Sequence, residues 1–108
     1  MSKKAPSTVF GVRLRQARLH ADIPQDRLGV QIGLDETTAS ARISRYETGV
    51  HEPPFEVAKK IGAALSIPAA FFYCEDDALA DVVLAWGILK KKERERAKVL
   101  LQELSGAK

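Results

Sequence analysis

Apolar residues recur at helical spacing along the N-terminal part of the chain, and this pattern predicts short helices separated by turns. The first helix, of about three turns, is indicated by positions at i, i+4, i+7 and i+11: Phe10, Leu14, Ala17 and Ala21. Pro24 cannot continue that helix and suits the first turn of the next one, which we expect to run from Gln25 to Ile32 and to stop at Gly33. Residues 1–8 are expected to form a flexible polar tail.

The segment from Thr37 to Gly49 differs from an ordinary surface helix. A helix here turns Ala39, Ile43 and Tyr46 inward, and Gly49 supplies a residue that can end it with a positive φ. The outward side and its edges carry hydroxyls, a small apolar residue and an arginine: Thr37, Thr38, Ser40, Ala41, Ser44, Arg45 and Thr48. Such a side can approach another surface closely and place hydrogen-bond donors near phosphates. We therefore interpret the segment as the recognition helix of a DNA-binding protein.

Helical spacing resumes after a loop that contains two adjacent prolines. Apolar positions predict a helix over Phe55–Leu65, and Ile67-Pro68 begins a further short helix through Phe72. The aromatic residues Phe71, Phe72 and Tyr73 are expected to plug the core rather than to stack on bases, because no basic residues lie between them.

The C-terminal third predicts two helices with more apolar positions than one core-facing side requires. The first begins at Asp76-Asp77 and carries two stripes, of which one comprises Leu79, Val82, Val83, Trp86 and Leu89 and the other Ala80, Leu84 and Ile88. The last helix, from Lys92 to Leu104, has a stripe of its own: Ala97, Leu100, Leu101 and Leu104.

These surplus apolar positions favour association with a second copy, since DNA-binding proteins of this size often need two copies to cover an operator. The expected dimer interface comprises Leu84, Ile88, Leu100, Leu101 and Leu104. In the alternative, both stripes are buried within one chain, one on the core and one under the last helix. The basic run at residues 90–98 is more typical of a solvated helical face with ion pairs than of a DNA-contacting arm.

Composition and charge fit a small globular protein with a nucleic-acid partner. The chain has 108 residues, of which 45% are hydrophobic and 29% charged. Its net charge of +3 is ordinary in itself, but residues 1–51 hold eight Lys/Arg against five Asp/Glu, whereas residues 52–108 hold nine of each. The excess positive charge therefore lies in the half that contains the candidate recognition helix. No apolar run suits a membrane span or a signal peptide, so we expect a cytoplasmic, nucleoid-associated protein and no membrane partner.

No catalytic or metal-binding constellation is visible in the sequence. The single cysteine, Cys74, fits a reducing compartment, and His20 and His51 are too distant to suggest a zinc site. Acid pairs fall at expected helix starts, where capping explains them, and glycine-rich phosphate loops and nucleophile motifs do not occur. We therefore expect no enzyme, no cofactor and no metal.

The order and spacing of these elements resemble the lambda-repressor-like, Cro-type helix-turn-helix family, which includes phage repressors and xenobiotic-response-element regulators. The resemblance depends on Leu14 and Arg18, Gln25 and Leu28, the run ISRYETG from Ile43 to Gly49, and LSIPAAFFY from Leu65 to Tyr73. It covers about residues 9–73 and implies an all-α fold with a DNA-binding helical bundle there. Residues 74–108 then form a C-terminal helical extension, which the surplus apolar positions indicate as the dimerising part.

The resemblance also implies roles for individual residues. Gln25 lies where an amide contacts a phosphate and braces the recognition helix, and Ser40, Ala41 and Arg45 lie where family members read base edges. The helical pattern independently places Ala41 and Arg45 outward. Arg45 has the geometry to bond O6 and N7 of guanine, and Ala41 can pack on a thymine methyl group. Lesser candidates for DNA contact are Thr37, Thr38, Arg42, Ser44 and Thr48.

Members of the family pair an arginine of the first helix with an acid near the end of the third, which implies an ion pair between Arg18 and Glu47. The alternative is that Glu47 is exposed at the helix C-terminus. The chain departs from the family pattern in three places. It has more residues than usual between Gly33 and Glu47, Pro24 replaces a Ser/Thr cap, and Gly29 replaces an alanine on which the third helix packs.

Together these features predict a sequence-specific transcriptional regulator. Repression is favoured over activation for a chain this short, acting as a homodimer on a near-palindromic operator with recognition helices about 10 bp apart in successive major grooves. The alternative is a protein-interaction module, such as an antitoxin that binds its toxin through the C-terminal helices. A steep loss of DNA affinity with added salt distinguishes the first from the second.

Overall fold

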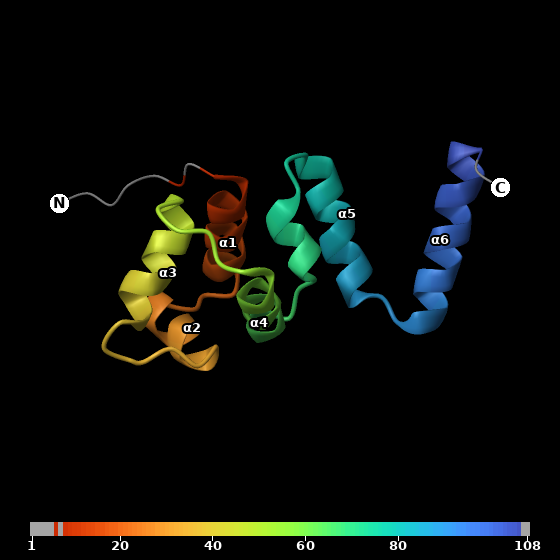
Figure 1. The fold of residues 1–108 in the computed structure, drawn as a ribbon. Coiled ribbons are helices and arrows are strands. Elements are labelled where there is room, and N and C mark those ends of the chain that lie inside the picture. The colour runs from red at the N-terminus through yellow and green to blue at the C-terminus, as the bar shows by residue number, and fades with distance from the viewer. Residues whose placement is uncertain (1–5, 7, 107–108) are drawn as a thin grey trace.

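The computed structural model describes residues 6 and 8–106, and within them it contains six α-helices, one 3₁₀ helix and no strand. The elements are α1 (Val9–His20), α2 (Gln25–Gln31), α3 (Ala39–Thr48), α4 (Phe55–Leu65), η1 (Ala69–Tyr73), α5 (Asp77–Ile88) and α6 (Lys91–Ser105). Helices α1 to α4 lie at one end, α5 lies beside them, and α6 stands apart at the other end (Figure 1). The molecule is accordingly long, with extents of 51 × 24 × 23 Å. The predicted all-α fold is confirmed.

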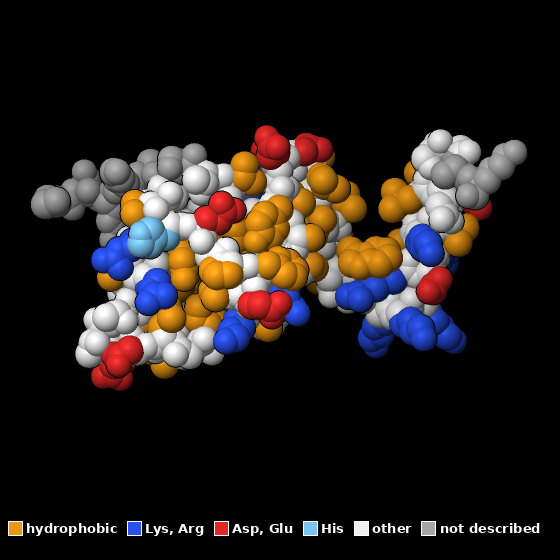
Figure 2. All heavy atoms as spheres, viewed as in Figure 1, with side chains coloured by type: hydrophobic (Ala, Val, Ile, Leu, Met, Phe, Trp, Pro, Cys, Tyr) orange, Lys and Arg blue, Asp and Glu red, His pale blue; other side chains and the backbone are white. Residues whose placement is uncertain are grey.

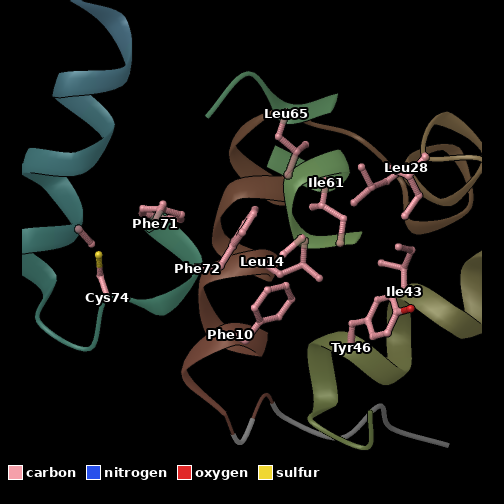
Figure 3. Close-up of a cluster of buried hydrophobic side chains, with 13 residues drawn as sticks. Phe10, Leu14, Leu28, Ile43, Tyr46, Ile61, Leu65, Phe71, Phe72 and Cys74 are labelled. Carbon is pink, nitrogen blue, oxygen red and sulfur yellow. The ribbon is translucent and has the colours of Figure 1, made fainter. Parts of the chain in front are cut away.

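The hydrophobic core lies between α1, α2, α3, α4 and η1 (Figure 3). Its largest fully buried side chains are Phe72, Leu14, Leu28, Ile43 and Ile61. These residues occupy the positions that helical spacing predicts to face inward, so burying them brings the four short helices together. None of the described helices is both long enough and apolar enough to cross a membrane.

The aromatic residues of η1 divide between core and surface. Phe71 and Phe72 are buried, and the ring of Phe72 lies 5.1 Å from that of Phe10 in α1. Tyr73, by contrast, is 44% exposed and meets Phe10 only edge-on. The expectation that all three aromatic residues plug the core is therefore wrong for Tyr73, because the 3₁₀ turn directs successive side chains to different sides.

A buried arginine that the sequence analysis did not single out connects α1 to the start of α5. Arg13 is 5% exposed, and its Nε donates to the Cys74 carbonyl at 2.7 Å. Its Nη2 donates to the Glu75 carbonyl at 3.2 Å and pairs with Asp77 at 2.9 Å. Arg13 lies between Phe10 and Ala17 on the inward side of α1. A charged residue among the inward positions of a helix indicates that buried partners lie nearby, since a buried charge requires them.

Helix α5 packs on the core through a side that takes residues from both predicted apolar stripes. Ala80 is buried, and Val83 and Leu84 are partly buried against the core. The expected grouping of Leu84 with Ile88 on a free side is therefore wrong, because Leu84 packs against the core, whereas Ile88 is 82% exposed. Helical spacing of three and four residues places Ala80, Val83 and Leu84 together, and this side meets η1. The exposed residues of α5 also show that α6 does not cover it within one chain.

Candidate nucleic-acid interface

Helix α3 has one buried side and one open side, as expected of a recognition helix. Ala39, Ile43 and Tyr46 are buried against the body of the fold. On the open side and its flanks, the exposed residues are Ser40, Ala41, Arg42 and Arg45, and Ser44 and Thr48 are half-buried. The helix is thus anchored by its apolar side while its polar side stays accessible. Lys/Arg and His side chains gather on the surface near α3 (Figure 2).

The turn before α3 takes up residues that were expected to be helical. Helix α3 begins at Ala39, so Thr37 and Thr38 precede it, and placing them on the helix is wrong. The carboxylate of Asp35 accepts hydrogen bonds from the Thr37 hydroxyl at 2.6 Å and the Thr37 N–H at 2.8 Å. These two bonds, of which the one from the hydroxyl has the larger effect, hold the pKa of Asp35 below its usual range. The turn is therefore locally hydrogen-bonded, which competes with extension of the helix.

This turn also limits which residues can face phosphates. Asp35 and Glu36 are exposed directly before α3, and carboxylates repel a phosphate backbone. The Thr37 hydroxyl is hydrogen-bonded to Asp35. The part of α3 that could lie near a phosphate without a neighbouring carboxylate thus begins at Ser40 rather than at Thr37.

The C-terminal end of α3 is fixed by a glycine and a hydroxyl. Gly49 has a φ of 82°, in the left-handed region that glycine adopts without strain. The Thr48 hydroxyl donates to the Ser44 carbonyl at 3.0 Å. The His51 N–H donates to the Arg45 carbonyl at 3.2 Å. These contacts hold the last turn of the helix in place beside Arg45.

Three helices meet at the carboxylate of Glu47, which is 3% exposed. Arg18 of α1 donates to it twice, from Nε to Oε2 at 2.5 Å and from Nη2 to Oε1 at 3.2 Å. Gln25 of α2 donates from Nε2 to Oε1 at 3.1 Å. The pair implied by the family resemblance is thus present, and Glu47 is not exposed as the alternative required. Because the pair is bidentate, it fixes the orientation of α3 relative to α1.

Gln25 joins this network as a brace for α3. The residue is 8% exposed, and its Oε1 accepts from the Ser40 hydroxyl at 3.4 Å. It therefore contacts both ends of α3, through Ser40 near the start and Glu47 near the end. Contact between Gln25 and a phosphate stays a prediction.

Two glycines allow α3 to lie close to its neighbours. A Cβ at Gly29 of α2 would lie 2.6 Å from the Cβ of Ala39, and one at Gly11 of α1 would overlap the Glu47 carbonyl oxygen. Gly29 is the position at which the family usually has alanine. Glycine is needed here because Ala39 comes so close. This departure from the family pattern therefore lets α2 and α3 pack more tightly.

Comparisons with known proteins agree with this geometry. A helix-turn-helix family model matches residues 14–72, which is more than half of the chain. The crystal structure of transcriptional regulator BswR matches with a TM-score of 0.79 and 32% sequence identity, covering 86% of this chain and 92% of that chain. No curated protein matches the chain significantly. From the family match and the structural likeness together, the chain belongs to the Cro/C1-type helix-turn-helix family of DNA-binding transcriptional regulators.

Proposed function

We propose that this protein is a repressor that reads a near-palindromic operator as a homodimer. The observation that carries the proposal is the two-sided character of α3, which is anchored by buried Ile43 and Tyr46 and leaves Arg45 exposed. In this proposal residues 9–73 bind DNA and residues 74–108 form the dimerising extension. The two copies of α3 enter successive major grooves about 10 bp apart. The protein acts in the cytoplasm, at the nucleoid.

The proposed base contacts come from the middle of α3. Arg45 donates to O6 and N7 of a guanine, Ala41 packs on a thymine methyl group, and Ser40 bonds a base edge from its position beside Gln25. Arg42, on the flank of the helix, contacts a phosphate. Weaker contacts, mainly to the backbone, are assigned to Gln25, Ser44 and Thr48. Thr37 and Thr38 are not assigned such a contact, because both hydroxyls bond Asp35 in the turn before α3.

Replacing Arg45 by alanine tests the guanine contact. We expect Arg45→Ala to weaken binding to the selected operator by about 1–3 kcal/mol and to relax the preference at one base position in each half-site. Arg42→Ala is the matched control, because it removes another exposed arginine of the same helix. Arg42→Ala should weaken binding to all DNA sequences by a similar factor. A uniform loss in Arg45→Ala as well would overturn the base assignment.

Selection from random double-stranded DNA at physiological salt, followed by sequencing of the bound pool, tests the function itself. The proposed repressor should enrich two related half-sites in inverted orientation, with centres about 10 bp apart. Enrichment of a single half-site would contradict binding as a homodimer. A pool without a consensus would contradict sequence-specific reading.

A second candidate function is a protein-interaction module of the same fold, such as an antitoxin. It is supported by the exposed apolar residues of α5 and α6, among them Ile88 at 82% and Leu104 at 86% exposed. Salt dependence separates the two functions, because a protein that contacts several phosphates loses DNA affinity steeply as salt is added. A flat response, together with tight binding to a protein partner, would favour the interaction module.

A further inference from the structure

Helix α6 touches α5 near its start, but the described part of the chain leaves its apolar stripe open to solvent. It has fifteen residues, all of them described, and none is buried. Leu100 is 49% exposed, Leu101 53% and Leu104 86%. A single helix of this length is marginally stable in water, and packing of an apolar side supplies most of the stability of helices in proteins. Another surface is therefore needed to cover this stripe.

The outer side of α5 presents a second apolar surface that faces solvent. Leu79 and Val82 are each 50% exposed, and Trp86 is 36% exposed. The small residues Ala78 and Ala85 lie beside Val82, at i−4 and i+3, and are also exposed. This side leaves room for another helix to approach closely.

Arg94 holds α5 and α6 in a defined arrangement. Its Nε donates to the Trp86 carbonyl at 3.0 Å, its Nη2 donates to the Gly87 carbonyl at 3.3 Å, and its guanidinium lies 5.5 Å from the centre of the Trp86 ring. Ala97 and Leu101 follow Arg94 on the same side of α6, at i+3 and i+7. The two apolar surfaces therefore border one open cleft, which Figure 2 shows with hydrophobic side chains on both walls.

Charge indicates what fits this cleft. The start of α5 carries Asp76, Asp77 and Asp81, whereas the start of α6 carries mostly lysine and arginine. Because α5 and α6 run in opposite directions, the acids lie at the open end of the cleft and the bases at the closed end (Figures 1 and 2). An inserted helix with a basic N-terminal half would meet the acids if it ran parallel to α5. It would also keep its positive charge away from the basic half of α6. Helix α6 of a second copy has this charge distribution and an apolar stripe.

We propose that α6 of a second copy lies in the cleft between α5 and α6, parallel to α5 and antiparallel to the α6 of the first copy. The exchange is reciprocal, so that a two-fold axis relates the two clefts. Leu101 of each chain, on the side of α6 that borders its own cleft, packs against α6 of the other chain, and Leu100 and Leu104, farther round the helix, pack toward the outer side of its α5. This inference rests on the proposed homodimer and adds the element that is exchanged and its direction.

One pair of variants tests which side of α6 is covered. Leu101→Glu places a carboxylate in the stripe, and we expect it to raise the dimer dissociation constant at least about tenfold. Val99→Glu is the control, because Val99 is 49% exposed but lies two residues away, on a different side of α6. It should leave the constant unchanged. Since both residues are exposed in the single chain, neither substitution disturbs the core.

Sedimentation equilibrium gives the dissociation constant, and fluorescence reports on the cleft. Trp86 is the only tryptophan of the chain, and its emission should shift to shorter wavelength as the wild-type protein dimerises. Equal weakening by Leu101→Glu and Val99→Glu, or dimerisation without a shift in Trp86 emission, would overturn the proposal.

Zero-length cross-linking of a mixture of isotopically light and heavy chains tests direction. The proposed arrangement yields links between chains from Asp77 or Asp81 to lysines at residues 90–92. Within one chain Asp77 lies about 16 Å and Asp81 about 10 Å from the end of α5 that leads to these lysines, at 1.5 Å per residue, and only links that join a light chain to a heavy one count. A dimer without such links would overturn the insertion and leave the homodimer of the proposed function intact. A chain that stays monomeric at all concentrations tested would overturn both.

Discussion

Replacing Glu47 by alanine is expected to lower the free energy of unfolding by about 3–5 kcal/mol, which is the usual cost of removing one member of a buried ion pair. The change leaves the charge of the Arg18 guanidinium, in a side chain only 11% exposed, without its carboxylate, while its bond to the Ile23 carbonyl remains. It also removes the hydrogen bond that Gln25 Nε2 donates to Glu47. Urea unfolding followed by circular dichroism measures the loss.

The control for this variant is Glu36→Ala, which removes an exposed acid from the turn before α3. It should change the free energy of unfolding by less than about 0.5 kcal/mol. The double variant Arg18→Met/Glu47→Gln should recover part of the loss, because it removes both charges and keeps an amide oxygen that can accept from Gln25. If Glu47→Ala were no less stable than Glu36→Ala, the pair would not hold α1 and α3 together.

Replacing Gly11 by alanine is expected to cost about 3 kcal/mol, at the upper end of the range for overpacked interiors. Glycine-to-alanine changes in a helix normally stabilise it by about 1 kcal/mol, so the expected sign is the reverse of the usual one. The reason is that the new Cβ would overlap the Glu47 carbonyl oxygen. This oxygen belongs to the backbone, so α3 as a whole must move away from α1.

The same unfolding measurement checks this expectation, with Val12→Ala as control at the next position of α1, where the side chain is 37% exposed. The Gly11→Ala protein should also bind the selected operator more weakly, since α3 shifts relative to the body of the fold. An unfolding midpoint at or above that of the wild-type protein would mean that the two helices approach less closely than described.

Much of the helix-turn-helix part could be predicted from the sequence, because its signals are local and strong. Pro24, the paired prolines before Phe55 and the positive φ of Gly49 define where helices start and stop. The inward positions of α3, Ile43 and Tyr46, follow from spacing alone. The link between Arg18 and Glu47 came from the family resemblance, since no periodicity relates residues 29 positions apart.

The errors lie where several arrangements satisfy the same local pattern. Helical spacing shows which residues of α5 share a side, but the choice of the side that packs on the core depends on η1, and Leu84 was therefore misplaced. The sequence pattern predicts a start of α3 that is too early, because it does not show the hydrogen bonds from Thr37 to Asp35 that compete with the helix. Arg13 was overlooked because its carbonyl partners lie more than sixty positions away along the chain. The roles in DNA contact stay predictions.

The buried contacts of Arg13 bear on which spacing of operator half-sites the proposed dimer would accept. Arg13 fastens the first helix to the start of α5 through two backbone carbonyls and Asp77. In a homodimer joined through the C-terminal helices, this connection transmits the separation of the two subunits to the two reading helices. A rigid connection restricts the protein to operators whose half-sites have one spacing. A looser connection between α1 and α5 would let the protein bind operators with base pairs inserted or deleted between the half-sites, while it still reads each half-site.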